Sequence, residues 1–85
     1  MSRYRVRYAG EAEITRARMS PAFRARFEAA MATTLARDPY GHGSSPSDSP
    51  KEKNRRLATV AGAIVRYYVA GPPVLVATAV KSIHG

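Results

Sequence analysis

Basic and apolar residues alternate strictly at the start of the chain. From residue 3 to residue 8, an arginine follows or precedes a Tyr or Val at every position. Because successive side chains of a strand point to opposite faces, this pattern predicts a half-buried strand. Tyr4, Val6 and Tyr8 are expected to face the core, and the arginines form a basic ladder if the other face is open to solvent.

The next segment has the signals of two short helices in succession. Residues 11–19 read as the first helix, with Glu11 and Glu13 in the first turn, where carboxylates complement the helix dipole. Ser20 followed by Pro21 is a strong restart signal, because Ser caps a helix and Pro fits its first position. The two residues therefore predict that a second helix begins here.

Large apolar residues recur at helical spacing along this second helix. Phe23, Phe27 and Met31 form its apolar stripe, which is expected to be core. The helix is predicted to stop near Arg37, because the residue before Pro39 is disfavoured in helical conformation.

The second half of the chain reads as a loop followed by strands. Residues 38–53 are rich in Gly, Ser and Pro, which predicts a flexible loop. Strands are expected at residues 55–60, 63–69 and 74–82, with glycine-containing turns between them. The predicted order is β-α-α-β-β-β. Residues 1–85 are thus expected to form one α+β domain, with two N-terminal helices packed on a four-stranded, mainly antiparallel sheet.

Charge changes this picture by suggesting a partner. The net charge is +8, from 14 Lys and Arg against 6 Asp and Glu. The last three predicted strands hold no acid, and their four basic residues are Arg55, Arg56, Arg66 and Lys81. Because the guanidinium fork matches phosphate and stacks on bases, the sheet is predicted to face nucleic acid. The alternative is that the surplus arginine is only a solvated surface.

Several chemical classes find no support in the composition. The chain has no Cys and only two His, so neither a disulfide framework nor a structural metal site is expected. No cofactor-binding loop or nucleophile elbow is identifiable. Neither a signal peptide nor an apolar run of about 18 residues is found, which predicts a cytoplasmic protein without a membrane partner.

Four pieces of sequence, in this order and at this length, carry a resemblance to a known family. They are the opening Tyr-x-Val-x-Tyr strand, Leu-Ala-Arg-Asp-Pro at residues 35–39, Val-Arg-Tyr-Tyr-Val at residues 65–69 and Val-Lys-Ser-Ile-His-Gly at residues 80–85. Together they resemble the RelE/ParE superfamily of bacterial toxins from type II toxin–antitoxin pairs. The resemblance covers nearly the whole chain.

The resemblance implies two activities. RelE-like members cut messenger RNA in the ribosome, whereas ParE-like members inhibit DNA gyrase and cut nothing. Both kinds are neutralised by a cognate antitoxin, through which alone they contact operator DNA. The expected function is a ribosome-dependent, metal-independent mRNA endoribonuclease that acts through a 2′,3′-cyclic phosphate. The alternatives are a non-catalytic gyrase inhibitor and a degenerate member that binds antitoxin and operator DNA.

Two residues are candidates for the cleavage chemistry. Arg66 would stabilise the charge of the pentavalent phosphorane, and His84 would act as general acid or base. RelE-like enzymes usually hold an arginine where this chain has Ile64, and Arg66 lies two residues on, on the same face of the strand. His84 matches a C-terminal histidine of RNA-cleaving members, but Gly85 follows it instead of a tyrosine.

Six further residues are candidates for nucleic-acid binding. Tyr67 and Tyr68 fall on opposite faces of their strand, so one is expected in the core and the other, assigned as Tyr68, stacks on a base. Five cations are assigned to backbone phosphate: Lys51, Lys53, Arg55, Arg56 and Lys81. The basic ladder of the first strand would extend this footprint if its face is open.

Overall fold

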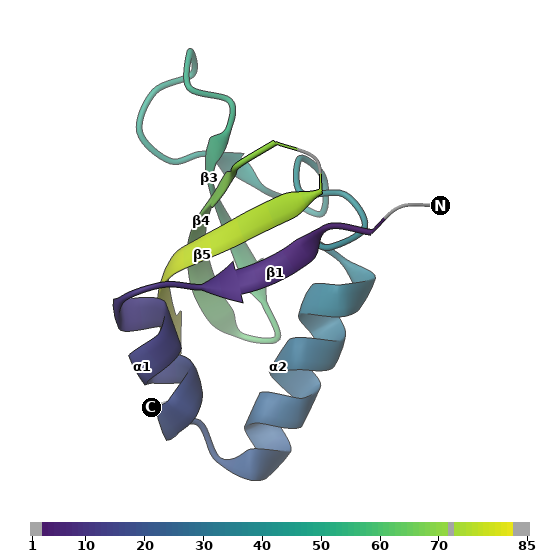
Figure 1. The fold of residues 1–85 in the computed structure, drawn as a ribbon, viewed down its shortest axis with the longest axis vertical. Helices are drawn as coiled ribbons and strands as arrows, with labels where there is room; N and C mark the ends of the chain where they lie inside the picture. The colour runs from purple at the N-terminus through teal and green to yellow at the C-terminus, as the bar shows by residue number, and fades with distance from the viewer. Residues whose placement is uncertain (1–2, 72, 83–85) are drawn as a thin grey trace.

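The computed structural model describes residues 3–71 and 73–82 and has an α+β fold (Figure 1). Two helices precede four of its five strands, as their residue ranges show. The elements are β1 (Arg5–Tyr8), α1 (Glu11–Arg18), α2 (Pro21–Thr33), β2 (Ser45–Pro46), β3 (Arg55–Val60), β4 (Ala63–Val69) and β5 (Val74–Ser82). The fold class and the two helices are confirmed. The expected count of four strands is wrong, because the segment between α2 and β3 contributes the short strand β2.

The five strands form one mixed sheet in the order β1-β5-β4-β3-β2. The first strand lies parallel to the last, with Arg5 opposite Val74, and the three other pairs are antiparallel. The tight turn between β3 and β4 uses Ala61 and Gly62, both with positive φ. A β-bulge interrupts the pairing of β4 with β5. Arg66 pairs with Ala79 and the next residue, Tyr67, pairs with Ala77, so one residue of β5 is left without a partner in β4.

The start of α2 matches the sequence signal, and its end does not. The Ser20 hydroxyl accepts a hydrogen bond from the Phe23 amide at 3.2 Å, as an N-cap should. The helix ends at Thr33 rather than near Arg37. Thr34 leaves the helical conformation while its hydroxyl donates to the Ala30 carbonyl at 2.6 Å. Hydroxyl groups of this kind compete for backbone partners and favour a helix end.

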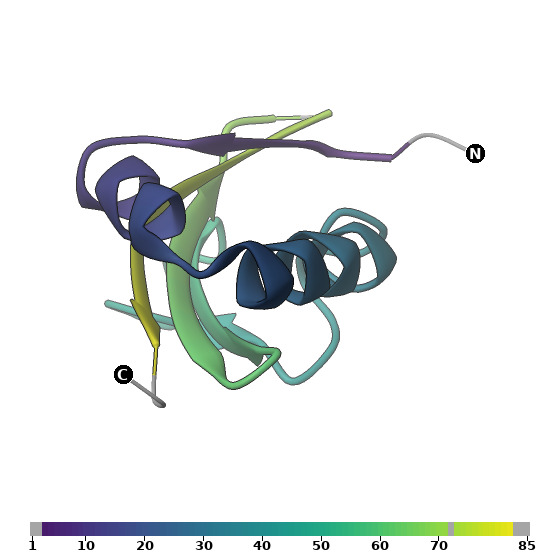
Figure 2. The same cartoon turned by 90° about the horizontal axis from the view of Figure 1, so that it is seen from below.

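The core lies between the helices and one face of the sheet. Helix α1 packs on β5 and α2 contacts β3, while the sheet curls around α2 (Figure 2). The largest fully buried side chains include Phe27, Met31, Leu35 and Tyr67. Within the described residues, neither helix is long and apolar enough to cross a membrane.

The first strand confirms the predicted alternation. Val6 and Tyr8, together with Tyr4 just before the strand, are half-buried and pack against the core, whereas Arg5 and Arg7 are exposed. The register places Arg7 beside Val76 and Val6 beside the buried Leu75. The arginines of β1 therefore lie on the face of the sheet that points away from the core, which is called the open face below.

The segment expected to be a flexible loop is partly regular. Ser45 and Pro46 pair with Leu57 and Arg56 of β3. Beyond β2, the chain projects from the sheet as a loop before it returns to β3 (Figure 1). This part, residues 47–54, is called the projecting loop.

Candidate nucleic-acid interface

The register of the sheet lines up four side chains across the open face. Arg7 of β1 lies opposite Val76 of β5, which lies opposite Tyr68 of β4, which lies opposite Arg55 of β3. Paired side chains on one face of adjacent strands stand about 5 Å apart. Tyr68 is exposed and so are both arginines. The row therefore presents an aromatic ring on the open face with guanidinium groups to either side.

The next two rows bring Arg66 and Lys81 to the same part of the open face. Arg66 pairs with Leu57 and Ala79, and Ile64 pairs with Lys81. These side chains line a shallow hollow of about 560 Å³, which is closed on one side by Glu11 and Thr15 of α1. Arg66 and Lys81 thus line the same hollow.

The bulge in β5 sets which way Lys81 faces. Thr78 is the extra residue, because its two neighbours pair with adjacent residues of β4. One extra residue reverses the alternation of the strand beyond it. Val76 and Lys81 therefore both lie on the open face, although they are five positions apart in the chain. Val76 is nevertheless largely covered, whereas Lys81 is exposed.

The structure corrects the assignment of Arg56 to phosphate binding. Its side chain is only 8% exposed and lies on the core side of β3. The guanidinium donates to the Ser44 hydroxyl at 2.9 Å and to the Lys53 carbonyl at 3.0 Å, and it lies 5.2 Å from the centre of the Tyr40 ring. Arg56 therefore links Ser44, just before β2, to Lys53, near the end of the projecting loop. The sequence signal for its inward position is the alternation of the strand, which puts Arg56 on the same face as Ala58.

Tyr40, to which sequence reasoning assigned nothing, belongs to the same set of contacts. Its hydroxyl donates to the Asn54 side-chain oxygen at 2.6 Å, and its carbonyl accepts from Arg56. The buried Tyr67 hydroxyl donates to the Pro39 carbonyl, and burial raises the pKa of Tyr67. Tyr67 is thus the core tyrosine of the pair, and Tyr68 is the one on the open face, as predicted.

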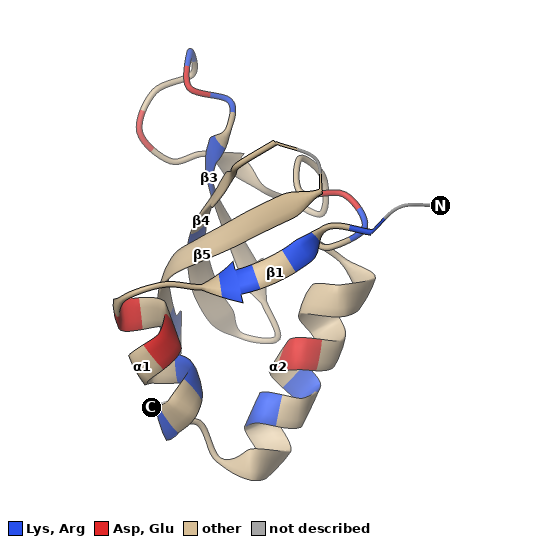
Figure 3. Ribbon diagram, viewed as in Figure 1, with Lys and Arg blue, Asp and Glu red and all other residues tan. Residues whose placement is uncertain are grey.

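The projecting loop carries both signs of charge toward the sheet. Lys51 and Lys53 lie on this loop and are exposed. Asp48 lies 4.0 Å from Arg66, and Glu52 lies 3.3 Å from Arg55. In Figure 3 the loop shows both acidic and basic segments, whereas the strand ribbons show basic segments without acidic ones. The loop acids are therefore the carboxylates paired with the cations of β3 and β4.

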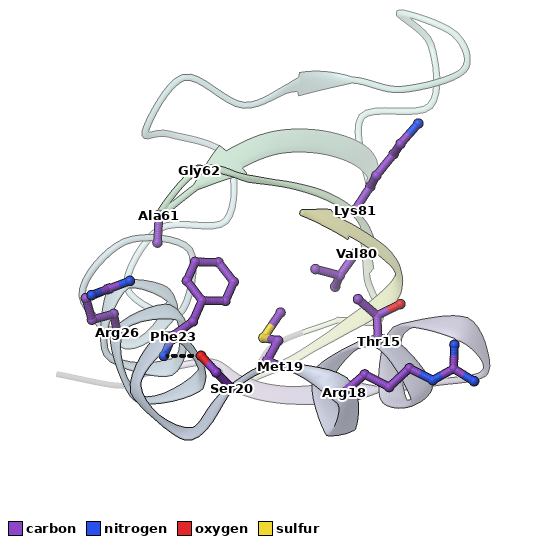
Figure 4. Close-up of a pocket in the computed structure, with 10 residues that line it drawn as sticks. All are labelled: Thr15, Arg18, Met19, Ser20, Phe23, Arg26, Ala61, Gly62, Val80 and Lys81. Atoms are coloured by element: carbon purple, nitrogen blue, oxygen red, sulfur yellow. Dashed lines mark hydrogen bonds between the residues drawn. The ribbon is translucent and has the colours of Figure 1, made fainter. Parts of the chain in front are cut away.

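A larger hollow lies at the junction between the helices and the turn of β3 and β4. It has a volume of about 1030 Å³, and Met19, Phe23 and Val80 point into it (Figure 4). Arg26 and Lys81 lie at its margin. Lys81 consequently borders both this hollow and the smaller one beside Arg66.

The second catalytic candidate, His84, lies outside the described residues. Of the other predicted residues, the structure gathers Arg55, Arg66, Tyr68 and Lys81 on the open face. Arg5 and Arg7 of the basic ladder lie on this face too, which meets the condition in the sequence analysis that the face be open to solvent.

Comparison with known proteins identifies no relative of this chain. No family model matches the chain, and no curated protein or solved structure matches it either. The RelE/ParE resemblance thus remains an expectation drawn from sequence motifs. The function proposed below rests on the residues of this chain and on the geometry of the open face.

Proposed function

We propose that this protein is a RelE/ParE-like toxin that acts as a ribosome-dependent mRNA endoribonuclease and binds RNA across its open face. The observation that carries the proposal is the row in which exposed Tyr68 lies between Arg7 and Arg55, with Arg66 in the neighbouring row. No strand of the described sheet contains an acid. An aromatic and arginine-rich face, built from strands that hold no acid, suits a single-stranded polyanion.

Binding would use two kinds of contact. A base stacks on the Tyr68 ring, which tolerates every base because each has a π-face. The arginines on either side contact the phosphates that flank this base, which fixes the strand without reading its sequence. The face therefore suits unpaired RNA, whose bases are free to leave the strand.

Cleavage would proceed by attack of the 2′-hydroxyl oxygen on the adjacent phosphorus. The bond from phosphorus to O2′ forms and the bond to O5′ breaks, leaving a 2′,3′-cyclic phosphate and a 5′-hydroxyl. Arg66 donates to the non-bridging oxygens as charge develops on them. His84, assigned from the sequence, takes the 2′-hydroxyl proton or protonates O5′. Lys81 holds a neighbouring phosphate in the hollow that it shares with Arg66.

A second candidate function is inhibition of a protein target such as DNA gyrase, as in ParE-like members. The observation that favours it is Ile64, which stands where RelE-like enzymes usually hold an arginine and which lines the hollow beside Arg66. An apolar side chain at that place supplies no charge to a phosphorane. In either case the partner that neutralises the protein would be a cognate antitoxin.

The test is to induce the chain in cells and map messenger RNA 5′ ends within minutes. We expect new cuts inside translated codons for the wild type, and a loss of at least about tenfold in cut frequency for Arg66→Ala and for His84→Ala. Arg26→Ala is the matched control, because it removes an exposed arginine from α2 rather than from the sheet. Its cuts should equal those of the wild type.

Growth arrest with intact messages would reject the nuclease and favour the gyrase alternative. Absence of both arrest and cuts would favour the degenerate member. Cuts that persist in Arg66→Ala would leave RNA cleavage standing and remove Arg66 from its mechanism.

A further inference from the structure

We infer that the projecting loop is an internal competitor of RNA, because its acids Asp48 and Glu52 occupy the cations that a phosphate backbone would use. The inference rests on the proposed RNA-binding function of the open face. It adds a regulatory contact that the proposed cleavage mechanism does not contain.

The geometry of the two ion pairs carries the inference. Asp48 Oδ1 lies 4.0 Å from Arg66 Nη1, and Glu52 Oε2 lies 3.3 Å from Arg55 Nε. Arg66 is the proposed catalytic arginine, and Arg55 ends the row that contains Tyr68. Both acids come from one loop of eight residues, and each reaches a different strand of the sheet.

The distribution of acids shows that this pairing is specific to the loop. The strands themselves hold no acid, and among the described residues no ion pair reaches Arg5 or Arg7. The remaining two ion pairs join Arg16 to Glu13 and Glu28, on the helices. Two carboxylates held against sheet arginines present oxygen acceptors at the places where RNA would present phosphate oxygens.

The loop is anchored so that its acids can leave without unfolding the sheet. At the start of the loop the Ser47 amide donates to the Arg55 carbonyl, and near its end the Lys53 carbonyl accepts from the Arg56 guanidinium. Between these anchors, the ion pair with Arg66 is the one side-chain contact that joins Asp48 to β4 among the described residues. Because all four paired side chains are about half exposed, the ion pairs are weak and RNA can displace them.

The test compares RNA affinity in charge-matched variants. Fluorescence anisotropy measures the binding of a labelled, unstructured 12-nucleotide RNA to wild type, to Asp48→Asn/Glu52→Gln and to Glu13→Gln/Glu28→Gln. The last variant removes the same two charges from the helical side. We expect the loop variant to bind roughly three- to tenfold more tightly, and the control less than about twofold, at about 50 mM salt.

A double-mutant cycle locates the competition. The gain from Asp48→Asn should disappear in an Arg66→Ala background, because the acid then has no cation to occupy. Equal tightening in the loop variant and in the helical control, or a gain that survives Arg66→Ala, would overturn the inference while leaving RNA binding established. If no variant binds RNA, the proposed function fails and the inference with it. Circular dichroism of each variant confirms that the fold is retained.

Discussion

Arg55 and Arg56 are neighbours in the chain with opposite environments. Because side chains of a strand alternate, Arg55 points to the open face and Arg56 to the core side of β3. Arg55 has one exposed ion pair, whereas the Arg56 guanidinium is shared among a hydroxyl, several carbonyls and the ring of Tyr40. One arginine is thus available to a ligand, and the other is part of the folded framework.

The two arginines should therefore separate stability from binding. Arg56→Ala leaves the partly buried carbonyls of Tyr40, Ser44 and Lys53 without this donor and is expected to lower the free energy of unfolding by about 2–3 kcal/mol. Arg55→Ala should change it by less than about 0.5 kcal/mol, since exposed ion pairs contribute little. Urea unfolding followed by circular dichroism measures both. Equal losses in the two variants would contradict the framework role of Arg56.

Tyr8 predicts a loss of stability at alkaline pH. Burial, followed by the nearby Glu28 carboxylate, raises the pKa of Tyr8 from 10.0 to about 12. Because the folded pKa lies above the unfolded one, the stabilisation is complete below pH 10 and is lost as pH rises toward about 12. Between pH 9 and pH 11, Tyr8→Phe should lose less free energy of unfolding than the wild type.

Tyr68→Phe is the control for this measurement, because it removes a hydroxyl from the open face. Its stability between pH 9 and pH 11 should follow that of the wild type. A Tyr8→Phe variant that declines as steeply as the wild type would show that other groups cause the alkaline loss.

At the scale of elements, the strands were the most predictable part of the fold. The bounds predicted for β3, β4 and β5 are those observed, because alternation and glycine turns act locally. The same alternation predicted that Tyr67 and Tyr68 fall on opposite faces, and the burial of Tyr67 beside the exposed Tyr68 confirms it. The alternation also implies that Arg56 points inward, because Arg56 and Ala58 share a face of β3. Its positive charge instead led to its assignment to phosphate binding.

Elements that depend on distant contacts were not predictable. Strand β2 has two residues, one of them proline, and exists because the chain returns beside β3. The end of α2 is set where Leu35 and Ala36 become buried and the Ala36 carbonyl accepts from the Tyr4 amide. The bulge at Thr78 likewise depends on the pairing of β4 with β5. No local sequence pattern therefore predicts that Lys81 lies on the open face.

At the scale of the molecule, the net charge of +8 makes salt the simplest probe of the proposed RNA binding. Each phosphate neutralised on a single strand contributes about −0.7 to the slope of log affinity against log salt. Arg7→Gln and Arg55→Gln should each reduce the magnitude of this slope by about 0.7, because both belong to the Tyr68 row. Anisotropy titrations between about 50 and 300 mM KCl measure it.

Arg26→Gln is the control for the salt series, since it lowers the net charge equally from a position on α2. Its slope should match that of the wild type. A reduction of the same size in all three variants would mean that RNA responds to total charge and not to the row.

The parallel pairing of β1 with β5 has a consequence for how the protein is made. β1 leaves the ribosome early, yet its hydrogen-bonding partner is β5, the strand synthesised after all the others. The helices and the β3–β4 hairpin can form from nearby residues, but contacts between distant residues form slowly and close the fold late. Arg7 therefore joins Tyr68 and Arg55 only once translation has passed β5. A nascent chain lacks the finished row, which delays any RNA binding across it until synthesis of the sheet is complete.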